Sequence, residues 1–287
     1  MTARRVTANS FSFVFLLSIL TLAAPVPVSA QLSKIDEASA ELAAKLKARK
    51  PRPQLVSVTD FSPADPAILP QAHYLALYLS GSLWLRGKDF LKVDHVDVDK
   101  TGIESSPLTS QDMAHLAGKL EGDFLVTGSV EKTQNVYTLK LSVLHLPDAS
   151  PFDSQIIELK TSEFLESFSA PIQSPNKPGI NGLGMPTCKD MRVPSFGRDV
   201  LALGIHGVLT MKALVSAQGT VQQIQPTRML GFPSDEDVYK LVKTWKCEPV
   251  HDQSGHLVEI VVPVEITIGG SSGAGTGVSA ISRKPNP

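Results

Sequence analysis

The segment GVLTMKALVSAQGTVQQIQPTRMLGFPSDEDVYKLVKTWKCEPV, residues 207–250, carries the clearest indication of fold in this chain. Two stretches with alternating apolar side chains, 208–215 and 220–225, flank Gly219. Alternation with a period of two predicts strands, and glycine readily takes the positive φ that tight hairpins need. The segment therefore predicts a β-hairpin.

A helix is predicted to follow the hairpin. Its apolar residues recur at the spacing i, i+3, i+4 and i+7, which places them on one helix face that we expect to be buried. Ser234, followed three residues later by Asp237, is typical of a helix N-cap. The predicted inner face consists of Val238, Leu241, Val242 and Trp245.

The stretch HLVEIVVPVEITI, residues 256–268, predicts a long closing strand. Pro263 interrupts it, and because proline has no backbone N–H to donate, we expect an edge or a bulge at that position. Residues 186–269 therefore predict a small domain in which a three-stranded antiparallel sheet packs on one or two helices.

Residues 31–165 predict a second domain in which helices and strands alternate. Helical periodicity covers 33–50, 67–86 and 108–122. The predicted buried faces of the first two helices are Ile35, Ala38, Leu42 and Leu46, and Ile68, Ala72, Leu75, Leu79 and Leu83. Strand patterns cover 55–61, 90–98, 123–130 and 136–146, with a further candidate at 154–160, and the strands 123–130 and 136–146 should form a hairpin. The fold class is therefore α+β, with two small α/β-layer domains. A linker rich in Pro, Ser, Gly and Asn is predicted over 166–185, and a flexible tail over 270–287.

The first 30 residues are typical of a secretory signal peptide. Arg4 and Arg5 precede an apolar run, and Val28 and Ala30 occupy the −3 and −1 positions of a cleavage site after Ala30. No cysteine follows the apolar run directly, so a bacterial lipoprotein is not predicted. We expect an exported protein of the periplasm or cell envelope; the alternative is an uncleaved anchor.

The two cysteines, Cys188 and Cys247, both fall in the predicted C-terminal domain. Export makes an oxidising compartment the expected environment, so we predict a disulfide between them. The alternative is two free buried thiols. Two cysteines without a histidine pair at ligand spacing cannot supply the four ligands of a structural zinc site, and no metal is predicted.

Several motifs occur together between 186 and 269: Gly207-Val208, Gly219-Thr220-Val221, DEDVYKLVKTW, WKCEPV and GHLVEIVVPVEITI. In combination they resemble the C-terminal domain of the TonB family of energy transducers. The resemblance implies that fold and a role in docking peptides or proteins. In place of the family's Pro-rich spacer, this chain has a predicted folded domain.

A fainter resemblance concerns residues 31–165. The stretches LVSVTDF, LALYLSGSL and LAGKLEGDFLVTGSVEK resemble periplasmic modules at the N-terminus of TolB and in the FlgO and CsgG groups.

No catalytic residues are predicted, since the sequence holds no G-x-S-x-G, H-E-x-x-H or P-loop motif. Asp94, Asp97 and Asp99 could offer oxygens to calcium, but acids alternating with valines more often mark the solvated face of a strand. The net charge of −1 gives no electrostatic case for binding nucleic acid. The seven histidines are scattered: His73, His95, His115, His145, His206, His251 and His256.

We therefore predict a non-enzymatic envelope protein that binds or scaffolds other proteins, without a cofactor. Its expected partner is an outer-membrane or other envelope protein, docked by strand addition to an exposed edge of the C-terminal sheet. The alternatives are a TonB-type energy transducer for outer-membrane receptors and an exported enzyme.

Overall fold

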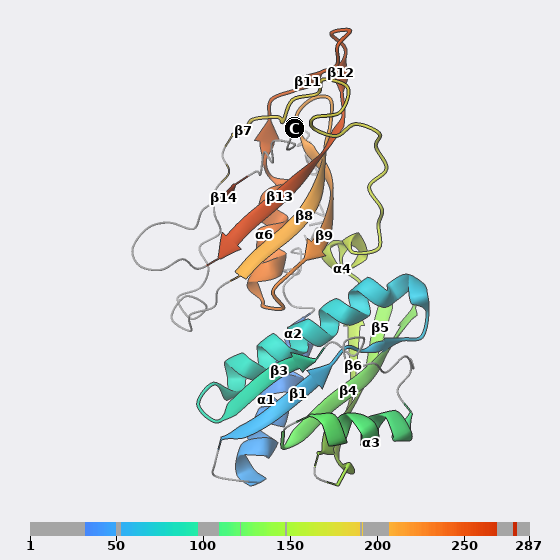
Figure 1. The fold of residues 1–287 in the computed structure, drawn as a ribbon, viewed down its shortest axis with the longest axis vertical. Helices are drawn as coiled ribbons and strands as arrows, with labels where there is room; N and C mark the ends of the chain where they lie inside the picture. Colours follow the sequence, from blue (N-terminus) through green and yellow to red (C-terminus); the bar gives the residue numbers. More distant parts are fainter. Residues whose placement is uncertain are drawn as a thin grey trace, which may run out of the picture.

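The computed structural model describes residues 32–49, 53–96, 109–120, 122–146, 148–189, 191, 207–268 and 278–279. The predicted signal peptide and residues 192–206 lie outside these ranges. The fold is α+β. Two bodies stack along the long axis of the molecule, with the short helix α4 (Glu163–Ser167) between them (Figure 1). No helix in the described ranges is both long and apolar enough to cross a membrane.

The first body is built on a mixed sheet of order β3-β1-β4-β5-β6, with β2 beside β4. β1 pairs in parallel with β3 and β4, whereas β4, β5 and β6 form antiparallel neighbours. The predicted hairpin forms between β4 and β5, around a turn at Gln134 and Asn135. The strands are β1 (Gln54–Thr59), β2 (Ser62–Pro63), β3 (Leu91–Val96), β4 (Phe124–Thr133), β5 (Val136–His145) and β6 (Ser150–Lys160).

Helices cover both faces of this sheet. Helices α1 (Ser33–Arg49) and α2 (Leu69–Gly87, after a 3-10 turn at Pro66–Ile68) pack against each other on one face. Helix α3 (Ser110–Lys119) lies on the other, where Leu116 packs with Leu125 and Leu144. Because successive strand residues point to opposite faces, Phe124 and Val126 enter the main core while Leu125 enters the α3 cluster.

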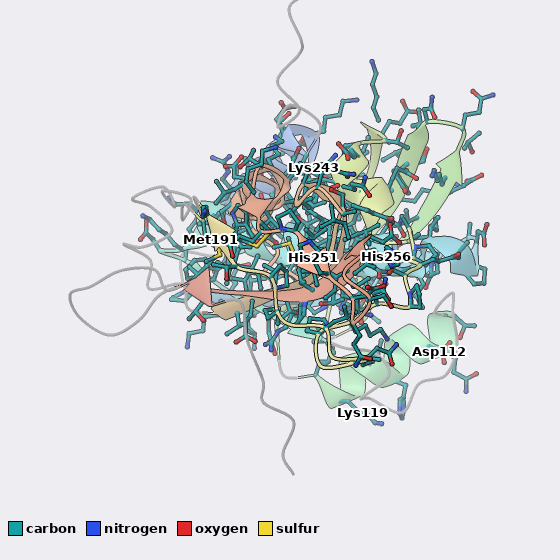
Figure 2. All side chains as sticks on the ribbon, turned by 90° about the horizontal axis from the view of Figure 1, so that it is seen from above. Asp112, Lys119, Met191, Lys243, His251 and His256 are labelled. Carbon is teal, nitrogen blue, oxygen red and sulfur yellow. A yellow bond between two sulfur atoms is a disulfide. The ribbon has the colours of Figure 1, made fainter. Side chains whose placement is uncertain are left out.

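Helix α3 begins at a capping box that was not predicted from the sequence. Thr109 accepts a hydrogen bond from the backbone N–H of Asp112, and the Asp112 carboxylate accepts one from the Thr109 backbone N–H. Figure 2 labels Asp112 and Lys119 on this helix; Lys119 is exposed, whereas Leu116 is fully buried. The helix thus presents an apolar side to the sheet and a polar side outward.

Helix α2 is buried on more than the one face that its sequence periodicity predicted. The predicted inner face, which includes Leu75, Leu79 and Leu83, is buried, but Tyr74, Tyr78 and several small residues on other sides are buried too. The second body packs on that other side: a side-chain carbon at Gly81 would lie 2.1 Å from the Gly231 carbonyl oxygen. One continuous apolar core therefore includes residues of both bodies.

The second body holds the predicted hairpin and closing strand. Strands β13, β8 and β9 form an antiparallel sheet, and the two-residue β14 pairs with β13 at Glu265 and Ile266. Helix α6 packs on this sheet at β9. Gly219, in the turn between β8 and β9, has φ +80° as the sequence predicts. The elements are β7 (Cys188–Lys189), β8 (Gly207–Val215), β9 (Val221–Arg228), α6 (Ser234–Lys243), β10 (Lys246–Cys247), β11 (Val250–His251), β12 (Leu257–Val258), β13 (Ile260–Ile268) and β14 (Val278–Ser279).

Two details of α6 differ from the prediction. Val238, Val242 and Trp245 are buried, but Leu241 is only half-buried and Tyr239 is buried instead. The reason is tertiary: the Tyr239 ring packs 5.3 Å from that of Phe164 in α4. The helical periodicity of α6 alone cannot reveal this second contact surface.

The predicted N-cap at Ser234 is also wrong. Pro233 occupies the cap position and offers no side-chain hydrogen bond. Asp235 instead organises the preceding turn, because its carboxylate accepts hydrogen bonds from the backbone N–H groups of Leu230, Gly231 and Phe232 at 3.0, 2.7 and 3.4 Å. The carboxylate that binds the backbone at the start of α6 therefore belongs to Asp235, which lies inside the helix and not in front of it.

Candidate functional site

The structure joins Cys188 and Cys247 by a disulfide between strands β7 and β10. The two residues are directly paired in the antiparallel register, and their Cα atoms are 3.8 Å apart. The Cys247 backbone N–H donates to the Gly219 carbonyl at 2.7 Å. The bond therefore ties the entry of the second body to its hairpin, and we assign it a structural role.

The outer edge of β13 is where the sequence predicts partner docking. Pro263 pairs with Lys212 of β8 in an unbroken register, so the strand has no bulge there. Val261, two residues earlier, donates its backbone N–H outward to the Asn176 carbonyl at 3.0 Å, which places position 263 on the same outer side. Asn176 also donates its side-chain amide to the Glu259 carbonyl at 2.9 Å. The chain's own residues therefore occupy much of this edge.

A second edge, the outer side of β6, is more open. β6 ends the sheet order, and within the described residues no strand pairs with its outer side. Lys34 of α1 donates to the Glu158 carbonyl at 2.8 Å, which shows that the Glu158 backbone points away from β5. Backbone direction alternates along a strand, so the backbone groups of Ile156 and Ser154 point outward as well.

An open groove of about 600 Å³ runs between α1 and this edge. Ile156 is the most exposed large apolar side chain among the described residues, at 71% of its full surface. The groove is lined by Lys34, Glu37, Ala38, Glu41, Gln155, Ile156, Ile157 and Glu158. Three carboxylates against one ammonium give it a negative character.

Three chemistry-bearing side chains meet where the parallel strands β1 and β3 end. Asp60 directly follows β1, His95 lies in β3 opposite Val58, and His73 lies in the first turns of α2. One carboxylate oxygen, Asp60 Oδ1, is 2.7 Å from His73 Nδ1 and 3.0 Å from His95 Nε2. Among the described residues, this is the only group of three that could hold a metal ion.

The cluster is partly shielded from water. The side chains of Asp60 and His95 retain 21% and 18% of their exposure, whereas that of His73 retains 52%. Burial alone would raise the pKa of Asp60, but the hydrogen bonds to His73 and His95 outweigh burial and hold that pKa well below its ordinary range. The carboxylate is therefore ionised at neutral pH. On the far side of the His95 ring, Nδ1 lies 3.3 Å from Ser80 Oγ.

This cluster was not predicted from the sequence, in which His73 and His95 are two of seven scattered histidines and Asp60 belongs to no recognised motif. The positions of these residues in the predicted strands could have indicated the cluster. Asp60 lies near the end of one predicted strand and His95 lies in the next, and the carboxyl ends of neighbouring parallel strands lie together. Of the acids weighed for calcium, Asp94 is exposed, and Asp97 and Asp99 lie outside the described residues. His251 lies in β11 and His256 directly before β12, at the end of the second body away from the first (Figure 1); both are labelled in Figure 2.

Asp235 is the other group with an unusual environment. Its side chain is fully buried beneath α2, and burial raises its pKa to about 7 although three backbone N–H groups act in the opposite direction. Tyr74, completely buried in the same interface, has its pKa raised by burial and by the nearby charge of Asp235. The contact between the two bodies therefore contains an acid that titrates near neutrality.

Comparisons with known proteins return structures but no family. No family model and no curated protein matches the chain. Among solved structures, the chain is similar to the C-terminal domain of LpoB from Salmonella enterica, with 14% identity over 44% of this chain and 98% of that one, at a TM-score of 0.33. The chain is also similar to lipoprotein GNA1162 from Neisseria meningitidis, with 10% identity over 37% of this chain and 79% of that one, at a TM-score of 0.28. Likenesses at this level carry no conclusion about function.

These findings overturn the family resemblances drawn from the sequence. The similar structures are LpoB and GNA1162 domains rather than TonB domains, and the fainter TolB, FlgO and CsgG resemblance is matched by no family model. The physical reason is that the motifs were generic. A glycine in a tight turn, an amphipathic helix and an alternating closing strand suit any hairpin–helix–strand unit.

Proposed function

We propose that this chain is a non-enzymatic binding protein of the cell envelope. It docks an extended segment of an envelope partner protein along the outer edge of β6. The single observation that carries the proposal is the open β6 edge, whose outward backbone at Ser154 and Ile156 borders the groove beside α1.

The chemistry of the groove supports an extended protein segment as its occupant. Outward N–H and C=O groups on an edge strand can continue the sheet with an incoming strand. Ile156 offers an apolar contact, and the carboxylates of Glu37 and Glu158 favour basic side chains on the incoming segment. Lys34, which occupies the Glu158 carbonyl, is itself exposed and can swing aside.

An envelope location is supported by two features. The first 30 residues have the pattern of a secretory signal, and the only two cysteines are paired in a disulfide. Disulfides persist in exported proteins and are rare in reducing compartments.

The test uses a photo-crosslinking amino acid at Ser154 of the full chain, expressed in its own cells. We expect adducts with an envelope protein, and their loss in Ile156→Pro, since proline removes the outward N–H and is tolerated on an edge strand. Ile156→Thr keeps the N–H and serves as the matched control. A crosslinker at Ile180, exposed elsewhere, controls for chance encounters.

Two results would refute strand addition at β6. One is an adduct yield from Ser154 no higher than that from Ile180. The other is an adduct pattern that Ile156→Pro leaves unchanged while circular dichroism shows the variant folded.

A further inference from the structure

We propose that Asp60, His73 and His95 form a binding site for one zinc ion. The inference is independent of the β6 edge. It starts from the convergence of three ligand atoms, all within 4.8 Å of one another, which come from α2, from β3 and from the residue that follows β1. Imidazole nitrogens with one carboxylate oxygen are a usual ligand set for zinc.

The spacing of the three side chains suits the ion. Zinc bonds to histidine and carboxylate of about 2.0–2.2 Å place neighbouring ligand atoms about 3.4 Å apart in tetrahedral geometry. The present separations from Asp60 Oδ1 are 2.7 and 3.0 Å, so each must lengthen by less than about 1 Å. His73 is half exposed on the surface of α2 and can make that adjustment.

His95 has the second hydrogen bond that ligating histidines commonly make. With zinc on Nε2, the ring proton must reside on Nδ1, and Ser80 Oγ lies 3.3 Å away as its acceptor. Ser80 is 6% exposed, so this hydroxyl is held in place by the packing of α2. Such contacts orient a ligating ring and select its tautomer.

The sheet topology explains why these residues meet. β1 and β3 are parallel neighbours connected through α2, so their carboxyl ends lie together under the start of that helix. The carboxyl ends of parallel strands are where ligands bind in α/β sheets. Three protein ligands leave one coordination position for water or for a group from outside the chain.

The competing interpretation is a polar network without an ion, in which both histidines simply donate to Asp60. The two interpretations predict different zinc binding. In a zinc site, the ion replaces the two N–H contacts to Asp60, and zinc binding is saturable. In a polar network without an ion, there is no zinc binding that depends on His73.

The experiment titrates zinc into the EDTA-treated, disulfide-intact full mature chain by isothermal calorimetry. Cobalt is added in parallel to record the visible d–d absorption of bound Co²⁺. We expect one zinc per chain and a rise in Tm with zinc. His73→Gln, which alters an exposed side chain, should weaken binding at least tenfold and abolish the cobalt band.

His145→Gln is the matched control. His145 Nδ1 contacts Asp148 Oδ1 at 2.9 Å, an Asp–His pair that belongs to no group of three potential ligands in the described ranges. Its substitution should leave zinc affinity unchanged. The proposal is overturned if the unaltered chain shows no saturable zinc binding. It is equally overturned if His73→Gln binds zinc as tightly as the unaltered chain.

Discussion

At the scale of one residue, burial between the two bodies changes the pKa of Asp235. Its carboxylate organises the turn before α6 through three backbone N–H groups, yet it is fully buried between the two bodies. Burial penalises the charged form and wins over those hydrogen bonds, so the pKa rises to about 7. Ionisation therefore works against the packed arrangement.

We expect the free energy of unfolding to fall as the pH rises from about 4 to about 7 because of this residue. In that window the folded chain keeps a proton that the unfolded chain has lost, since the ordinary pKa is 3.8. The loss should be about 1–3 kcal/mol, at about 1.4 kcal/mol per pKa unit with some relaxation. Urea unfolding at pH 5 and pH 7 measures it.

Asp235→Asn should reduce the difference between the two pH values, because an amide cannot ionise. Asp237→Asn, which alters an exposed acid of the same helix, should leave the difference as in the unaltered chain. Equal pH dependence in the unaltered chain and Asp235→Asn would contradict the assignment. Asp60, whose pKa is lowered, acts in a separate window, since its contribution is lost only as the pH falls below about 4.

At the scale of elements, two hairpin turns of the second body allow a matched comparison. Gly219 and Gly255 both have φ +80° and both donate their N–H to the carbonyl three residues earlier. They differ in their surroundings. A side-chain carbon at Gly219 would lie 1.9 Å from the Cys247 carbonyl oxygen, whereas at Gly255 nothing lies within 4 Å.

Gly255→Ala should therefore cost about 1–2 kcal/mol, the penalty for a left-handed conformation with a side chain. Gly219→Ala should cost clearly more, because the β10 backbone must also move. Thermal and urea unfolding of both variants measures the difference. Similar losses in the two variants would show that the contact with Cys247 relaxes freely.

The pairing of β7 with β10 leads to a prediction about Cys188 and Cys247. We expect a disulfide in the mature protein, worth about 4 kcal/mol in the chain-entropy model for cysteines 59 residues apart. Mass spectrometry after unfolding and alkylation without reductant should show no added alkyl group, and two after reduction. Two alkyl groups without reductant would contradict the disulfide.

At the scale of the whole molecule, α2 holds the two bodies together. Gly81 of α2 approaches Gly231, and the ring of Trp84, also in α2, lies 6.2 Å from that of Phe232. A salt bridge between Lys243 of α6 and Glu163 of α4 adds a second connection. Lys243 is labelled in Figure 2. Because the apolar core is continuous across this contact, we expect both bodies to unfold together rather than in two steps.

Gly81→Ala tests the contact against a matched helix glycine. Alanine ordinarily stabilises a helix interior relative to glycine by about 1 kcal/mol. At Gly118, the next-to-last residue of α3, nothing lies within 4 Å of the added carbon, so a gain of up to this size should appear. At Gly81 the added carbon meets the Gly231 backbone, so we expect a net loss of stability. A gain at both positions, measured by urea unfolding, would show that the bodies are loosely associated.

The sequence by itself determined the local elements of this protein. The β4–β5 and β8–β9 hairpins, the positive φ of Gly219 and the buried faces of α1 and α2 all follow from periodicity and turn chemistry, which act between residues a few positions apart. Tertiary structure decided what required distant residues to meet. It buried Tyr239 in place of Leu241, enclosed α2 on a second side and raised the pKa of Asp235. It also brought Asp60 to His73 and His95, because strand pairing and helix packing, rather than spacing along the chain, set those distances.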